Sequence, residues 1–116
     1  MNLLNETIEK LKKYNKKIED IKWVGSNKHY IDIEDFKKLA NKNYDSSYGC
    51  MEVATNLLIV GEDWWLERHD YDGSEWWEYK KIPKKPEKKL KPKRIISNNL
   101  GYETLEEMNG EEYEYK

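Results

Sequence analysis

One stretch of the sequence decides the fold: Asp63-Trp64-Trp65-Leu66-Glu67-Arg68-His69-Asp70-Tyr71-Asp72-Gly73-Ser74-Glu75-Trp76-Trp77-Glu78-Tyr79. Two aromatic runs flank Asp72-Gly73, which is the strongest short-range signal for a β-hairpin. Neighbouring side chains of a strand point to opposite faces, so each adjacent pair of Trp residues places one indole on each face of the sheet. The stretch therefore predicts a two-stranded hairpin with large aromatic side chains on both faces.

The register of this hairpin stays open at this level. A two-residue turn at 72–73 sets two pairs of acids opposite each other, Glu67 with Glu78 and Asp70 with Glu75. Like charges directly opposite each other destabilise a sheet. A three-residue loop that begins at residue 71 or at residue 72 avoids both pairs. We favour these two longer loops, between which the sequence does not choose.

Apolar spacing predicts the elements that surround the hairpin. Residues 3–21 carry apolar side chains three, four or seven positions apart, which is typical of an amphipathic helix. Residues 22–32 form a short hairpin, Asp32 caps a second helix, and residues 52–60 form a central strand. The predicted fold class is α+β: an N-terminal helix, a short hairpin, a second helix, and an antiparallel sheet of three or more strands that contains the Trp-rich hairpin.

Composition and charge indicate how the 116 residues are organised. Charged residues make up 38%, but five Trp and nine Tyr favour a folded chain over a disordered one. Residues 61–79 hold seven acids and one Arg, whereas residues 80–94 hold eight Lys, one Arg and one Glu. Prolines interrupt the lysine run and prevent a regular helix or central strand there. We expect residues 1–82 to form a compact α+β domain, and residues 83–116 to be a basic linker and acidic tail packed on it.

The hairpin is the strongest candidate for a binding site. Trp and Tyr flanked by charge are typical of the energetically important residues of protein interfaces. We expect the aromatic side chains to anchor a protein partner, or a second copy in a homodimer, while the acids mimic phosphates. A covering of the aromatic residues by the protein's own helices and tail is the main alternative. The predicted partner-binding residues are Trp64, Trp65, Glu67, Asp70, Asp72, Glu75, Trp76, Trp77 and Tyr79.

Two other functions have weaker support in the sequence. Lysines beside aromatic residues suit phosphate contacts and base stacking, so a nucleic-acid interface would use Lys80, Lys81, Lys84, Lys85, Lys88 and Lys89. The acidic stretches on either side oppose this hypothesis, because they repel the same phosphates. A small metal-dependent hydrolase would need a cluster made of His69, Asp70, Asp72 and Glu75. Turn acids are common for conformational reasons alone, so we expect no catalytic residue, no metal and no cofactor.

The remaining features concern the cellular compartment. A single cysteine, Cys50, excludes an internal disulfide framework and fits a reducing environment. No apolar run approaches the roughly 18 residues of a membrane span, and charge follows the first residues closely, so neither a span nor a secretory signal is expected. We expect the protein in the cytoplasm of a bacterial host cell.

The stretch Ile59-Val60-Gly61-Glu62-Asp63-Trp64-Trp65-Leu66-Glu67-Arg68, followed by residues 71–79, resembles a family of small uncharacterised bacterial and phage proteins. The resemblance runs from about Trp23 to Pro83 and implies no activity or catalytic residue. Small acidic phage proteins of this kind include anti-CRISPR proteins, which occupy a site on an effector nuclease. The resemblance therefore implies an inhibitor of a host defence (CRISPR-Cas) effector, with that nuclease as its partner.

Overall fold

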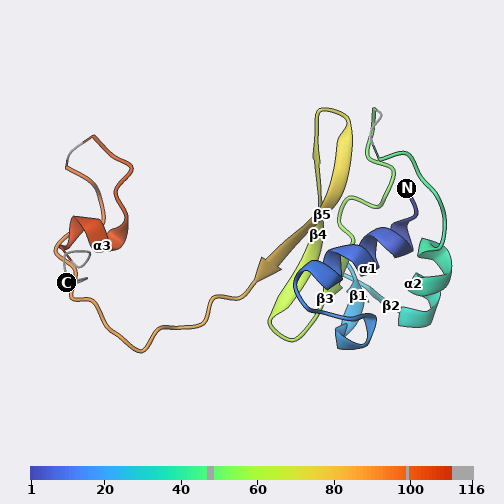
Figure 1. Ribbon diagram of the computed structural model, residues 1–116, viewed down its shortest axis with the longest axis horizontal. Helices are drawn as coiled ribbons and strands as arrows, with labels where there is room; N and C mark the ends of the chain where they lie inside the picture. The colour runs from blue at the N-terminus through green and yellow to red at the C-terminus, as the bar shows by residue number, and fades with distance from the viewer. Residues whose placement is uncertain (47–48, 99, 111–116) are drawn as a thin grey trace. The chain divides into compact units, whose positions relative to one another are not determined.

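The computed structural model describes residues 1–46, 49–98 and 100–110 (Figure 1). The chain divides into two units, Met1–Pro83 and Lys84–Lys116, and each is described by itself. The elements of the first unit are α1 (Leu3–Lys13), a 3-10 turn (Ile18–Asp20), β1 (Trp23–Gly25), β2 (Tyr30–Ile31), α2 (Ile33–Ala40), β3 (Leu58–Val60), β4 (Trp64–Tyr71) and β5 (Ser74–Lys81).

The strands of the first unit form one antiparallel sheet in the order β2-β1-β3-β4-β5. The short hairpin β1–β2, the second helix α2 and the Trp-rich hairpin β4–β5 all occur where the sequence predicts them, so the predicted α+β fold class is confirmed. β3 pairs with β1 on one side and with β4 on the other, which makes it the central strand. None of the helices in the described parts of the chain has the length and apolar character of a membrane span.

The hairpin register differs from the two that we favoured. Tyr71 lies opposite Ser74, so the turn has two residues, and Glu67 lies opposite Glu78. Asp72 and Gly73 have φ values of 49° and 86°, the left-handed pair that a type I′ turn requires. The charge argument was wrong because Glu67, Glu78 and Glu75 each accept a hydrogen bond from a neighbouring side chain, and Asp70 is exposed to solvent. Turn geometry therefore decides the register.

Two predicted elements are shorter than expected. The first helix ends at Lys13 rather than at residue 21, and Asn15 takes the left-handed conformation that often ends a helix (φ 59°). The strand predicted over 52–60 begins only at Leu58, because the N–H groups of Glu52 and Val53 donate to a side chain rather than to a neighbouring strand. Tertiary contacts account for this second difference.

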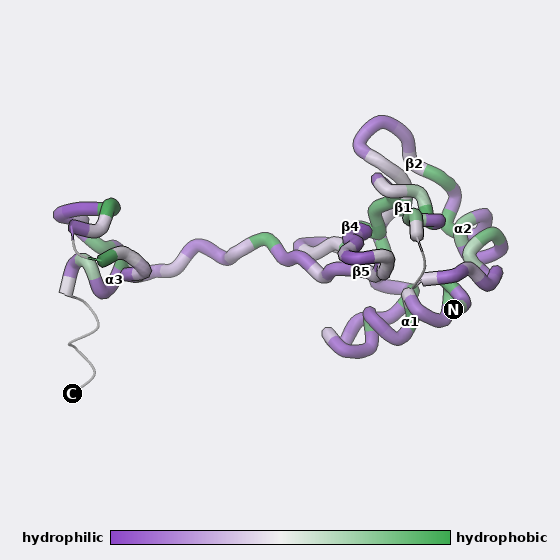
Figure 2. Tube along the Cα trace, turned by 90° about the horizontal axis from the view of Figure 1, so that it is seen from above, coloured by the Kyte–Doolittle hydropathy of each residue, from purple (hydrophilic) through white to green (hydrophobic). Residues whose placement is uncertain are grey.

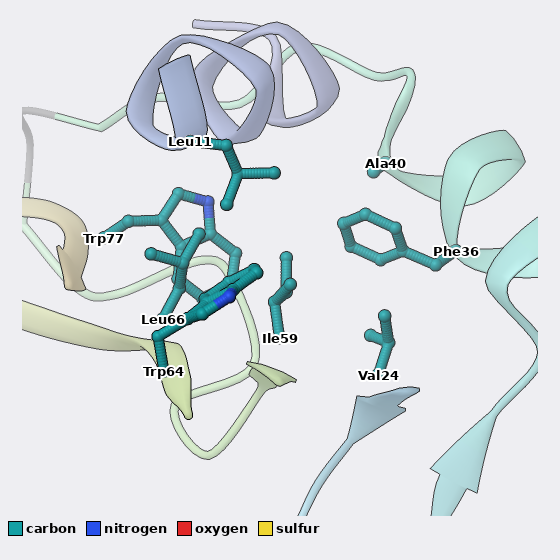
Figure 3. Close-up of a cluster of buried hydrophobic side chains, with 8 residues drawn as sticks. All are labelled: Leu11, Val24, Phe36, Ala40, Ile59, Trp64, Leu66 and Trp77. Atoms are coloured by element: carbon teal, nitrogen blue, oxygen red, sulfur yellow. The ribbon is translucent and has the colours of Figure 1, made fainter. Parts of the chain in front are cut away.

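The core lies between the helices and one face of the sheet. Figure 3 shows Leu11 of α1 and Phe36 of α2 pointing toward side chains of the strands. α1 contacts β5, α2 contacts β1, and α1 lies along one side of the β4–β5 hairpin (Figure 2). The buried apolar residues are Leu11, Val24, Phe36, Ala40, Ile59, Trp64, Leu66 and Trp77.

The described part of the second unit contains one short helix, α3 (Leu105–Met108), which the sequence analysis missed. Thr104 caps this helix, and the side chain of Asn109 accepts a hydrogen bond from the N–H of Lys93 at 2.7 Å and donates one to the carbonyl of Arg94 at 3.1 Å. These contacts join the segment at Lys93 and Arg94 to the end of α3. The expected packing of residues 83–116 on the first domain stays a prediction, and the acidic end, residues 111–116, lies outside the described residues.

Candidate protein-binding surface

Alternation along β4 and β5 divides the hairpin into an inner face, which packs on the helices, and an outer face. The inner face of β4 carries Trp64, Leu66 and Arg68, all of them buried. On β5, the buried residues Glu75 and Trp77 share this face. The expectation that each Trp pair supplies one indole to each face is confirmed.

The inner face contains a buried ion network centred on Arg68, whose side chain is fully buried. Its guanidinium donates to Glu75 at 2.6 Å, to Glu6 of α1 at 3.2 Å and to the hydroxyl of Tyr44 at 3.0 Å. The guanidinium carbon also lies 4.7 Å from the centre of the Trp77 ring, within the range of a cation–π interaction. Arg68 therefore connects the hairpin, α1 and the loop that follows α2.

The pKa values of Arg68 and Tyr44 are both raised, which keeps Arg68 charged and Tyr44 neutral. Burial opposes the charge of Arg68, but its hydrogen bonds to Glu75 and Tyr44 and the nearby charge of Glu6 outweigh burial and raise its pKa. Burial raises the pKa of Tyr44 to about 12, assisted by its hydrogen bond to Glu6. Arg68 and Glu75 are buried, and Glu6 and Tyr44 are partly buried, so the network connects elements of the first unit beneath its surface.

The outer face carries the second Trp of each pair together with two acids. The indole N–H of Trp65 donates to Glu67 at 2.6 Å, and that of Trp76 donates to Glu78 at 2.7 Å. His69 lies 2.7 Å from the other carboxylate oxygen of Glu67. The hydrogen bonds from His69 and Trp65 lower the pKa of Glu67. Each carboxylate of the like-charged pair thus accepts a hydrogen bond from an indole of its own strand, which explains why the register tolerates the pair.

The neighbouring strands extend this outer face with apolar residues. Trp23 of β1 lies opposite Val60, and Val60 lies opposite Trp65, so the three form a row across the sheet. Leu58 lies beside Glu67 in the next row. A hollow of about 460 Å³ is lined by Leu58, Val60, Trp65 and Glu67 of these rows together with residues of the adjoining loops, among them Asn27, Thr55 and Asn56. Among the described residues of the first unit, no helix packs over this outer face (Figure 2).

Sequence reasoning missed Trp23 as part of the surface. It was assigned only to a short hairpin, and no local signal shows that β1 lies two strands away from β4. Trp23, Trp65 and Trp76 are all half-buried, so each still exposes part of its indole. We use the name outer face for the set Trp23, Leu58, Val60, Trp65, Glu67, His69, Trp76 and Glu78.

The structure places three predicted partner-binding residues inside the molecule. Trp64 and Trp77 are 3% and 1% exposed, and Glu75 is 5% exposed, so these three do not contribute to the surface. Their positions on the inner face are the physical reason, because the helices cover that face. Tyr79 shares it and stacks on Tyr14, with 3.8 Å between the ring centres.

The other predicted residues are accessible. Trp65, Glu67 and Trp76 lie on the outer face, and Asp70 and Asp72 are exposed at the tip of the hairpin. The lysines of the alternative nucleic-acid interface are also exposed, with Lys80 and Lys81 at the end of β5 and Lys84, Lys85, Lys88 and Lys89 in the second unit.

The residues suggested for a metal-dependent hydrolase are not brought together. His69 bonds to Glu67 on the outer face, whereas Glu75 bonds to Arg68 on the inner face. Asp72 lies in the turn. Within residues 1–46, 49–98 and 100–110, no group of three or more His, Cys, Asp or Glu could hold a metal ion.

Comparison of the chain with protein-family models, with curated proteins and with solved structures finds no match. The resemblance to small bacterial and phage proteins therefore stays a prediction.

Proposed function

We propose that the protein is a non-enzymatic protein-binding module, and that the outer face of its sheet binds a basic surface of a partner protein. One observation carries the proposal: Trp65 and Trp76 flank an adjacent pair of carboxylates, and Trp23 extends the same sheet face, over which no helix of the first unit packs. Trp residues with large contact areas are typical anchors of protein interfaces.

The chemistry of the carboxylate pair favours a cationic partner group. Glu67 and Glu78 are directly opposite on neighbouring strands, so their charges repel and a cation placed between them is stabilised. An arginine guanidinium matches carboxylates with a planar set of donors and also stacks on aromatic rings, so Trp65 and Trp76 would hold its plane. A phosphate backbone would instead be repelled by the same pair.

The most concrete form of this proposal is a phage-type inhibitor of a host defence effector. Nucleic-acid channels of such nucleases are lined with Lys and Arg, as phosphate binding requires. The outer face would occupy such a channel sterically, and its acids would take the place of phosphates. Charge complementarity of this kind raises the association rate and selects the partner.

A pull-down from host lysate with the intact chain tests this proposal. We expect recovery of a nuclease or defence complex, and loss of that recovery when Glu67→Lys and Glu78→Lys are combined. Glu19→Lys is the matched control, because Glu19 is exposed in the 3-10 turn and outside the outer face. Recovery of housekeeping proteins alone, or equal recovery by the double variant, would refute the proposal.

Nucleic-acid binding through the lysine segment is the second candidate, favoured by the exposure of its lysines. Filter binding of single-stranded DNA and RNA over a salt series distinguishes nucleic-acid binding from the protein-binding function. Binding that weakens with salt and falls after Lys84→Glu and Lys85→Glu supports this candidate. Absent or salt-insensitive binding excludes it.

A further inference from the structure

The free edge of β5 is a second surface of the first unit. β5 forms one edge of the sheet and has eight residues, whereas the strand at the opposite edge, β2, has two. A long edge strand presents backbone N–H and C=O groups that can pair with another chain. β5 is therefore the place where this sheet can be extended.

Two hydrogen bonds show which backbone groups of β5 are free. The N–H of Ile82 donates to the carbonyl of Asp63, on the β4 side, at 2.7 Å. The N–H of Glu75 donates the opposite way, to the carbonyl of Ser46, at 2.9 Å. Because these directions alternate along a strand, the backbone groups of Trp77, Tyr79 and Lys81 point away from β4.

The open part of the edge is bounded at both ends. At its beginning, the contact with Ser46 occupies the N–H of Glu75. At its end, Pro83 has no N–H and cannot continue a ladder. The free segment therefore runs from 76 to 82, and Tyr79 is its midpoint. Among the described residues, no backbone partner lies on the outward side of this segment.

We propose that a second copy of this chain adds its β5 to this edge, antiparallel, about a two-fold axis at Tyr79. The Tyr79 backbones of the two copies pair with each other, and Trp77 pairs with Lys81 of the second copy. Glu78 then lies directly opposite Lys80 of the second copy, and Lys80 lies opposite its Glu78. The sequence of the edge is thus complementary to itself in charge.

Other two-fold positions along the same edge lose this complementarity. An axis at Glu78 places Glu78 opposite Glu78 of the second copy. An axis at Lys80 places Lys80 opposite Lys80 of the second copy. An axis at Trp77 places Tyr79 opposite Glu75, whose N–H is already bonded. An axis at Lys81 sets lysine against lysine and places Pro83 opposite Tyr79. Only the axis at Tyr79 uses the whole free segment with opposite charges across it.

The surroundings of the edge leave room for an added strand. A groove of about 530 Å³ lies between α1 and β5, lined by α1 residues together with Trp76 and Trp77. The added strand would also join the outer faces of the two copies into one continuous surface. The dimer uses the backbone of β5 and the Glu78–Lys80 pairs, and it shares Glu78 with the outer face. Lys80 lies outside the outer face, so Lys80→Glu tests the dimer separately from the proposed function.

Sedimentation velocity of the full chain over a concentration series tests the dimer. We expect a reversible monomer–dimer equilibrium. Lys80→Glu or Glu78→Lys alone should weaken dimerisation roughly tenfold, because each change turns two attractive contacts into repulsive ones. The double variant E78K/K80E should restore the wild-type equilibrium, since it exchanges the two charges. Melting temperatures of all variants check that the monomer remains folded.

Cysteine cross-linking tests the register separately, in a C50S background that removes the native exposed thiol. A mixture of E78C and K80C chains should form a disulfide-linked dimer under mild oxidation. Either chain alone should form far less, because position 78 lies opposite position 80 of the second copy and neither position lies opposite itself. A chain that stays monomeric at every concentration overturns the proposal. Equal cross-linking of E78C alone and of the mixture overturns the axis at Tyr79.

Discussion

Replacement of Arg68 by methionine is the sharpest test of how the first unit is held together. The side chain of Arg68 is fully buried and its partner Glu75 is 2% exposed at the side chain, so the substitution leaves a buried carboxylate without its cation. The N–H groups of Glu52 and Val53 still donate to that carboxylate, at 2.6 and 3.4 Å. These two donors do not replace a full positive charge.

The expected loss follows from the burial of this pair. Removing one partner of a buried ion pair typically costs about 3–5 kcal/mol. A single domain has a free energy of unfolding of roughly 5–15 kcal/mol, so the variant Arg68→Met should keep only part of its stability. Contacts with Glu6 and Tyr44, and the stacking on Trp77, are lost at the same time. We therefore expect the upper part of this range.

Urea denaturation followed by circular dichroism at neutral pH measures this loss. The double variant R68M/E75Q is the decisive companion, because glutamine keeps an acceptor for Glu52 while removing the uncompensated charge. It should recover at least half of the loss, since removing both ions of a buried pair is often close to neutral. Lys12→Met is the matched control on an exposed position of α1. A loss under about 1 kcal/mol for Arg68→Met, or no recovery in the double variant, would refute the reasoning.

Three further predictions concern packing and pH. Gly61→Ala should destabilise the first unit by about 1–3 kcal/mol in urea denaturation, because a Cβ there would lie 2.0 Å from the Trp64 ring; an unchanged midpoint would contradict this contact. The pKa of Glu67 is lowered in the folded state, so its ionised carboxylate stabilises the fold at pH values above 4.5, the pKa of the unfolded state. This stabilisation is lost as the pH falls through the folded pKa. Trp65→Phe removes one donor and should raise the Glu67 pKa in an NMR titration; no change would exclude the indole bond. The pKa of Tyr44, raised to about 12 by burial, predicts stability that declines as the pH rises from about 10 toward 12, measured by thermal unfolding; a flat profile would contradict it.

The parts of the fold that local chemistry specifies could be predicted. The existence of a hairpin at Asp72-Gly73 was predicted because both residues tolerate a left-handed backbone, although the loop lengths that we favoured were wrong. The helix of residues 33–40 follows from the spacing of Phe36 and Ala40, both of which are buried. Charge across the hairpin was a poor guide to the register, because the indoles of Trp65 and Trp76 donate hydrogen bonds that stabilise the two carboxylates while these remain charged.

The composition of the candidate site needed the tertiary structure. Alternation predicts that Trp64 and Trp65 lie on opposite faces, but it does not say which face the helices cover. From the sequence, Glu75 was interpreted as an acid near the turn. Its contact with buried Arg68 becomes visible only in the folded structure. Trp23 joins the surface through strand pairing with residues far along the chain, a contact that no local pattern contains.

The sequence by itself determined the fold class, the position of the hairpin and the alternation of its Trp residues, because these depend on backbone geometry and on neighbouring side chains, whereas the length of the turn was predicted wrongly. Only the tertiary structure decided which Trp residues anchor the core and which remain on the outer face. The reason is that burial is a property of packing between distant segments: α1 covers Trp77 through Leu11 and Thr7, and leaves Trp76 on the other side of the same strand.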